Sequence, residues 1–377
     1  MNVSLLLDYL NHCIRCRLFP GCAVAFGTSK SEPRVVVSGQ LTYQAKSHAV
    51  DVDTWYDLAS LTKPIATVSS FLTAVQHGKL HLETSVSHFF PQAICGNAQI
   101  RHLLSHSSGL PAYRPFFRFC HSAEEVVGQI VRCQPEFTPG SKSVYSDLGF
   151  ILLGRIMELL FEQRFRQLVQ ENVLNPLKLR AIQFGPLSGD RPSSVTETPG
   201  SSGQECPAAA ERKVAPTELD FRLHGFAVGV VHDENARLFD GAAGHAGLFG
   251  TIQEVARFPH LILSTTTMAT DAAPLQHQLS PELLRSWTRR QQWLPQSSWG
   301  LGWDTQTPDS SAGPALSASS FGHTGFTGTS MWIDPEQDLY VCILSNRVHP
   351  SRKIEGMKEA RRQIHALAVK ALRGEEL

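Results

Sequence analysis

Segments of strand-like composition lie at the two ends of this 377-residue sequence, and a long helical stretch separates them. Residues 21–28 and 34–41 are β-rich runs joined by a turn rich in Ser, Glu and Pro, which predicts an antiparallel hairpin. Residues 329–347 contain two further runs on either side of Pro335. From residues 60 to 179 apolar side chains recur mostly with the period of a helix. Strands from both ends can then share one antiparallel sheet, which leaves the helical stretch as a second lobe.

These patterns predict one domain of the α/β (α+β) class, with an antiparallel sheet flanked by terminal helices and an inserted, mainly helical lobe. The sheet lobe would comprise residues 1–59 and 250–377, and the helical lobe residues 60–249. Because 42% of the residues are hydrophobic, the chain can bury a large core. Residues 186–213 are rich in Pro, Ser, Gly and charge, which predicts a flexible surface insertion, either a lid or a disordered loop.

Helix boundaries are indicated most clearly at two places. Gly78 follows an apolar helical pattern and is suited to end that helix. Residues 146–165 form a second strong pattern, with Ser146 or Asp147 as its N-cap. Further helices are predicted at the N-terminus and at residues 251–264 and 350–373.

The charge balance argues against two classes of partner. The 34 basic and 34 acidic residues cancel, and no basic stripe or acidic tail is present, so we expect neither nucleic acid nor a membrane as partner. The N-terminal segment has Asp8 in its apolar run and no basic leader, which is typical of an amphipathic helix rather than a signal peptide. No segment approaches the roughly 20 apolar residues of a membrane helix. A cytoplasmic protein is therefore the expectation.

Cysteine spacing and the common cofactor motifs give no sign of a metal or cofactor. The eight cysteines are scattered, which is typical of reduced thiols. Cys13 and Cys16 form a lone CxxC, and a zinc site would need a second pair. No P-loop, HExxH, Rossmann or GxSxG motif is present. We expect no metal and no cofactor.

A lysine in an apolar helix, one turn after a serine, is the first candidate for chemistry. In the segment "ASLTKPIATV", Ser60 and Lys63 share one helix face, with Cβ atoms roughly 5 to 6 Å apart. Pro64 is tolerated only in a first helical turn, so Ser60 should lie at the helix N-terminus, where backbone N–H groups favour negative charge. If burial lowers the pKa of Lys63, its amine can take the serine proton. A lone SxxK is nevertheless expected about once by chance in a chain of this length.

Two later segments add further candidates in a fixed order. "SVYSDLGF" contains Tyr145 in a turn, with Asp147 two residues later. "FGHTGFTG" contains His323, Thr324 and Gly325 at the predicted start of an edge strand. Taken singly, each segment is more simply explained as a turn that begins a helix or a strand.

Together, the Ser-x-x-Lys, Tyr-x-Asp and His-Thr-Gly segments resemble the three motifs of the serine β-lactamase and penicillin-binding-protein superfamily. The resemblance is greatest to its class C-like branch, which also contains esterases and D-amino-acid peptidases. "RHLLSHSSGLP" (101–111), "WGLGWD" (299–304) and "SNR" (345–347) are also similar to segments of that branch. The resemblance covers nearly the whole chain outside residues 186–213.

The resemblance implies a role for each matching residue. Ser60 would be the nucleophile, Lys63 its proton acceptor, and Tyr145 the partner base that relays the proton to the leaving group. The backbone N–H groups of Ser60 and Phe326 would form the oxyanion hole. Asp147, His323, Thr324 and Gly325 would contact substrate.

Two positions depart from the β-lactamase pattern. Asp147 replaces the usual asparagine, which removes an amide donor and adds a negative charge. His323 replaces the usual lysine and, with an ordinary pKa near 6.5, would be only partly charged at pH 7. Both changes favour an esterase or amidase over an efficient β-lactamase. Arg347 could supply the missing positive charge.

The sequence therefore predicts a serine hydrolase that acts through a Ser60 acyl-enzyme on an ester or a small amide or peptide bond. A cytoplasmic muropeptide amidase, a D-amino-acid peptidase and a weak β-lactamase remain alternatives, as does a catalytically silent binding protein of the same fold. The partner would be a small ester, amide or peptide-like molecule, and the oligomeric state is left open.

A second polar group, formed by His232, Asp233, Glu234 and His245, admits a metal site or a Gly-rich active-site loop, and the loop is the simpler interpretation. His106 is expected to be structural.

Overall fold

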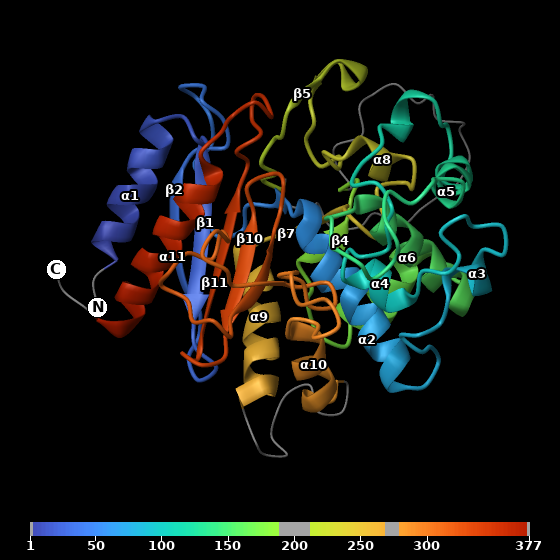
Figure 1. Cartoon of the computed structure of the whole chain (residues 1–377). Helices are drawn as coiled ribbons and strands as arrows, with labels where there is room; N and C mark the ends of the chain where they lie inside the picture. Colours follow the sequence, from blue (N-terminus) through green and yellow to red (C-terminus); the bar gives the residue numbers. More distant parts are fainter. Residues whose placement is uncertain (1–2, 188–211, 268–278, 375–377) are drawn as a thin grey trace, which may run out of the picture.

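The computed structural model describes residues 3–187, 212–267 and 279–374. A six-stranded antiparallel sheet joins the two ends of the chain (Figure 1). Its strands in spatial order are β2 (Arg34–Gly39), β1 (Gly21–Gly27), β11 (Leu339–Ser345), β10 (Ser330–Asp334), β9 (Phe321–Thr324) and β8 (Asp304–Thr305). Strand β1 pairs with β2 on one side and with β11 on the other, so the first and last strands of the sheet region are direct neighbours.

Helices cover both faces of this sheet. Helices α1 (Ser4–Arg15) and α11 (Met357–Arg373) pack together on one face, and α9 (Ile252–Thr267) lies on the other (Figure 1). Successive residues of β1 therefore enter different cores: Val24 packs in the layer under α1 and α11, and Ala23 and Ala25 pack in the larger core beyond. Because both faces are covered, every residue of β1 and β11 is buried, and these strands read as continuous apolar runs.

The helices of the central part of the chain gather beside α9, to the right in Figure 1. They are α2 (Ser69–Gln76), α3 (Val86–Phe89), α4 (Ile100–Leu104), α5 (Ala123–Val131), α6 (Asp147–Phe161), α7 (Phe165–Val169), α8 (Glu234–Arg237) and α10 (Pro281–Thr288). Two small antiparallel sheets accompany them, formed by β3 (Tyr56–Asp57), β7 (Leu248–Gly250) and β4 (Ile182–Phe184), and by β5 (Leu219–Asp220) and β6 (Gly225–Phe226). Helix α6 is apolar around most of its circumference and lies at the centre of this group.

The predicted fold class is confirmed, and the main helices and strands lie close to their expected positions. Ser146 caps α6 by accepting a hydrogen bond from Gly149 N. Gly78 has φ +64° just after α2, as a helix-ending glycine should. The prediction that His323 begins an edge strand is wrong: it is the third residue of β9, and the short strand β8 pairs outside β9.

The described residues do not test the predicted insertion in full or the predicted lobe boundaries. Residues 188–211 of the predicted insertion lie outside the described residues, and the lobe boundaries remain a prediction. None of the helices within the described ranges combines the length and hydrophobicity needed to cross a bilayer.

Candidate active site

The turn that presents Ser60 is held in a conformation that most residues avoid. Ala59, in the 3₁₀ turn Ala59–Leu61, has φ +47°, in the left-handed region, which costs a non-glycine residue about 1 kcal/mol or more. The buried carboxylate of Asp57 accepts hydrogen bonds from Ala59 N at 2.8 Å and from His232 N at 2.6 Å. The turn is therefore fixed by a part of the chain far away in sequence.

Ser60 lies at the start of a continuous helical run that passes through the π-helical segment Lys63–Val68 into α2. The prediction that Pro64 marks the first helical turns is confirmed. Lys63 Nζ is 2.9 Å from Ser60 Oγ, and the Tyr145 hydroxyl donates to the same oxygen at 2.8 Å. Residues from two motifs 85 positions apart thus meet on one oxygen atom.

Lys63 is a fully buried ammonium with three acceptors. Besides Ser60 Oγ, its Nζ contacts Asp147 Oδ1 at 2.7 Å and His245 O at 3.0 Å. The prediction that burial lowers the pKa of Lys63 is wrong in its net direction. Burial does disfavour the charged amine, but the Asp147 carboxylate and the Tyr145 hydroxyl outweigh it and raise the pKa above its ordinary value. Lys63 is accordingly protonated in the resting site.

Tyr145 is protonated as well. Burial raises the pKa of its hydroxyl to about 12, although the nearby Lys63 acts in the opposite direction. Its ring packs against His106 and Trp299, and the Lys63 ammonium lies 4.9 Å from the ring centroid. His106 has the expected structural role, since its Nδ1 accepts a hydrogen bond from Ser146 N and fixes the turn that carries Tyr145.

The turn after β9 faces the nucleophile. Gly325 N donates to Thr329 O at 2.7 Å, and a Cβ on Gly325 would lie only 1.9 Å from Thr329 Oγ1, so this close turn requires glycine. The buried Arg361 of α11 donates to the carbonyl oxygens of Gly325 and Thr329 at 2.8 and 2.9 Å. The Phe326 amide has no acceptor among the described residues, as an oxyanion donor requires.

His323 is neutral. Burial, together with the charge of Lys63, lowers the pKa of its imidazole to about 3, so the expected partial charge at pH 7 is not present. Its Nδ1 is 2.9 Å from the Thr324 carbonyl and must carry the proton, because a carbonyl only accepts. His323 therefore cannot hold a substrate carboxylate through a positive charge.

A cleft of about 800 Å³ connects these groups. Ser60, Tyr145, Asp147 and the 323–326 segment line one part of it, and the C-terminal segment 347–361 lines another. Arg347 and Arg361 face the cleft, and within the described part of the chain neither forms an ion pair. Arg347 stacks on Phe326, which is 49% exposed at the cleft.

The polar group around residue 233 also lies at this cleft. His245 Nε2 is 2.9 Å from Asp233 Oδ1, and His232 Nε2 is 3.1 Å from Glu218 Oε2. These are separate pairs, and across the described ranges no three His, Cys, Asp or Glu side chains converge as metal ligands. The sequence suggested the loop but gave no indication of either pairing, because each partner is set by the tertiary fold.

Comparison with known proteins agrees with this geometry. A model of the Beta-lactamase family matches residues 23–366. The chain is 30% identical over 319 residues to a putative D-alanyl-D-alanine carboxypeptidase of Escherichia coli K12, covering 78% of this chain and 70% of the relative. It is 28% identical over 317 residues to an N-acetylmuramyl-L-alanine amidase of Bacillus subtilis 168, covering 78% and 68%.

Solved structures support the same fold. A class C β-lactamase superposes with a TM-score of 0.71 at 17% identity, covering 99% of this chain and 97% of that structure. The family model spans most of the sequence, and the folds match along nearly the whole length. The chain therefore belongs to the Beta-lactamase family.

Proposed function

We propose that this protein is a serine hydrolase that cleaves an amide bond in a small peptide-like substrate through a Ser60 acyl-enzyme. The observation that carries the proposal is the pair of hydrogen bonds to Ser60 Oγ, from Lys63 at 2.9 Å and from Tyr145 at 2.8 Å, at the wall of an open cleft. A nucleophile needs a neighbour that exchanges its proton, and both groups are within reach. A binding protein without turnover would need neither contact.

The relatives favour an amide or peptide bond over an ester. One is named a putative carboxypeptidase and the other an amidase, and both names concern such bonds, which supports a muropeptide or a D-amino-acid peptide as substrate. Arg347 and Arg361 add positive charge to a cleft in which His323 is neutral. Asp147, Asp233, Glu234, Asp304 and Glu355 also line the cleft, so we expect a substrate carboxylate only at the wall that holds Arg347 and Arg361, because guanidinium groups bind carboxylates well.

Covalent labelling tests the nucleophile. Wild-type protein and the S60A variant would be incubated with a fluorophosphonate or with penicillin and examined by intact-mass spectrometry. We expect one adduct on the wild type and none on S60A. A wild-type protein that takes up neither reagent would refute the hydrolase proposal and favour a silent binding protein.

A substrate panel tests the bond that is cleaved. It would comprise p-nitrophenyl esters, nitrocefin, D-alanyl-D-alanine peptides and N-acetylmuramyl-L-alanine peptides, with products identified by mass. We expect release of an amine from one of the peptide substrates by the wild type and not by S60A. Cleavage restricted to the p-nitrophenyl esters would make the protein an esterase and contradict the amide assignment.

A further inference from the structure

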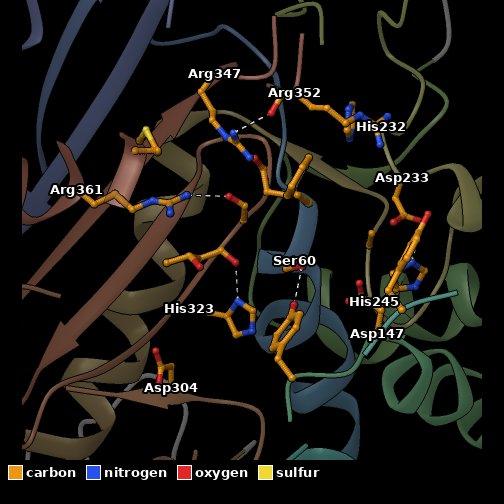
Figure 2. A pocket seen from close by; sticks show the side chains of 18 of the residues that line it. Ser60, Asp147, His232, Asp233, His245, Asp304, His323, Arg347, Arg352 and Arg361 are labelled. Carbon is orange, nitrogen blue, oxygen red and sulfur yellow. Dashed lines mark hydrogen bonds and ion pairs between the residues drawn. The ribbon is translucent and has the colours of Figure 1, made fainter. Parts of the chain in front are cut away.

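The wall of the cleft holds an imidazole that the proposed acylation step does not use. His245 is 1% exposed, and its Nε2 is 2.9 Å from Asp233 Oδ1. Both side chains line the cleft, and Figure 2 shows the pair on the side of Ser60 opposite to His323. The backbone of His245 is also close to the reacting atoms, since its carbonyl oxygen accepts from Lys63 Nζ at 3.0 Å.

The contact with Asp233 fixes the tautomer of His245. Burial alone would raise the pKa of Asp233, but His245 and the N–H of Ala236 lower it well below its usual range, so the side chain is a carboxylate. A carboxylate only accepts hydrogen bonds, so Nε2 of His245 carries a proton, and in the neutral imidazole Nδ1 is then the acceptor. That buried Nδ1 has no hydrogen-bond partner in the described part of the chain.

The loop that carries His245 is rigidly placed. A Cβ on Gly244 would lie 2.1 Å from Phe150 O, and a Cβ on Gly247, which has φ +130°, would lie 2.0 Å from Gly241 O. Thr67 Oγ1 also donates to Gly244 O at 2.6 Å. Only glycine permits this close approach to α6, and the imidazole is therefore held at a defined position in the cleft wall.

The groups around Ser60 leave a hydrolytic water without a free base. Lys63 and Tyr145 are both protonated and both donate to Ser60 Oγ. The imidazole of His323 has a pKa of about 3 and is a very weak base. An imidazole whose acceptor nitrogen is vacant and whose N–H is bound to a carboxylate is the arrangement that general bases use in acyl transfer.

The second histidine pair in the cleft is less suited to this task. His232 contacts Glu218, but that carboxylate also binds Arg352 through a short hydrogen bond, so its charge is shared. The His232 ring stacks on Phe326, whereas the backbone of His245 contacts Lys63, the neighbour of Ser60. His232 therefore offers a matched control within the same cleft.

We propose that His245, oriented by Asp233, is the general base that activates water for hydrolysis of the Ser60 acyl-enzyme. This inference rests on the proposed function. The water oxygen bonds to the acyl carbon as its proton moves to Nδ1 of His245. The tetrahedral intermediate then collapses, the bond from carbon to Ser60 Oγ breaks, and Oγ regains a proton from Tyr145 or Lys63. The imidazolium of His245 and the product acid then lose one proton each. One of these protons restores Tyr145 or Lys63, and the other is released to solvent as the product leaves as a carboxylate.

The test separates formation of the acyl-enzyme from its hydrolysis. Wild type, H245N, D233N and H232N would be mixed with p-nitrophenyl acetate, and the burst of p-nitrophenol, the steady-state rate and the acyl adduct would be followed by absorbance and intact mass. D233N retains the capping of Ala236 N, because asparagine caps helices as well as aspartate does. Thermal unfolding would verify that each variant is folded.

We expect H245N and D233N to keep the burst, to lose about 10²- to 10⁴-fold in the steady-state rate, and to accumulate the acetyl adduct on Ser60. H232N should not accumulate the adduct. Hydroxylamine, a stronger nucleophile than water, should restore turnover of H245N, which a merely structural defect would not allow.

Other results would overturn the inference. A slower burst without adduct in both variants would mean that His245 acts only by positioning Lys63. An unchanged ratio of burst to steady-state rate would show that hydrolysis does not depend on it. Absence of p-nitrophenol release and of an acyl adduct in both the wild type and H245N would instead refute the proposed function itself.

Discussion

The ion pair between Lys63 and Asp147 allows a quantitative prediction for the D147N variant. Lys63 is completely buried, the Asp147 side chain is 20% exposed, and their charged atoms are 2.7 Å apart. Asparagine keeps the size and one acceptor oxygen but leaves the ammonium without a counter-charge. Removing one partner of a buried pair costs about 3–5 kcal/mol, and the partial exposure of Asp147 favours the lower end. We therefore expect a loss of about 3 kcal/mol in the free energy of unfolding at pH 6.

The pH dependence of this loss follows from the direction of each pKa shift. In the wild type the pKa of Lys63 is raised, so the stabilisation is present at neutral pH and is lost only as pH rises through that raised value. In D147N only Tyr145 still opposes the effect of burial, so the pKa of Lys63 falls below its wild-type value, and folding at low pH must bury an ammonium without a counter-charge. The difference between the two proteins should be largest near pH 6 and shrink as pH approaches about 10.

The same shift predicts a change in acylation. If Lys63 must be neutral to take the proton of Ser60, the burst rate should rise with pH, and in D147N this rise should occur at lower pH than in the wild type. Urea unfolding and the burst with p-nitrophenyl acetate, each followed from pH 6 to 10, measure the two effects. D304N is a suitable control, because Asp304 lines the cleft and, within the described ranges, its carboxylate accepts hydrogen bonds from Ser298 Oγ and Thr305 N alone.

Two results would refute this reasoning. A destabilisation of D147N that is the same at pH 6 and pH 9.5 would mean that the loss of stability does not come from burying a charged Lys63 at low pH. A burst profile that moves equally in D147N and D304N would show that Asp147 does not control the protonation of Lys63.

Three further changes test individual contacts. Y145F removes one hydrogen bond to the nucleophile, and we expect the burst rate to fall about 10²- to 10⁴-fold while the unfolding midpoint in urea changes little. G244A forces a methyl group toward Phe150 O, so it should cost about 1–3 kcal/mol in urea unfolding, whereas G128A, on an open face of α5, should be neutral or slightly stabilising. D57N should cost about 1–3 kcal/mol in the same urea unfolding experiment, because the asparagine NH₂ group cannot accept a hydrogen bond and leaves either Ala59 N or His232 N without an acceptor. Stability equal to that of the wild type would contradict the hydrogen bonds described for Asp57.

Much of the fold could be predicted because its signals are local. The hairpin of β1 and β2, the cap at Ser146 and the first helical turn marked by Pro64 each depend on a few neighbouring residues. The SxxK spacing likewise placed Ser60 and Lys63 on one helix face, and their contact is present. Tyr145 was reached only through the order of motifs, since nothing local brings it near Ser60.

The remaining features of the site depend on long-range contacts. The apolar sequence around Lys63 indicates its burial, which lowers the pKa. It does not indicate that the pKa is raised overall, because the opposing carboxylate of Asp147 lies 84 residues away. The pairing of Asp233 with His245 depends on the path of a Gly-rich loop that lacks a helical or strand period. Asp57 gave no signal at all, although it supports the turn before the nucleophile.

The turn at Ala59 also has a consequence for how the protein folds. It is restrained by three long-range hydrogen bonds. His232 N donates to the Asp57 carboxylate, and the hydroxyls of Thr327 and Thr329 donate to the carbonyl oxygens of Asp57 and Leu58, across 175, 270 and 271 residues. Such distant contacts form late, because closing long loops is entropically costly. In an intermediate with its central helices formed and its C-terminal strands not yet paired, Ala59 would be free to leave the left-handed conformation, and Ser60 would not point toward the cleft. Uptake of an active-site label during refolding should consequently lag behind the recovery of helical circular dichroism, so the nucleophile itself reports when the last strands have joined the sheet.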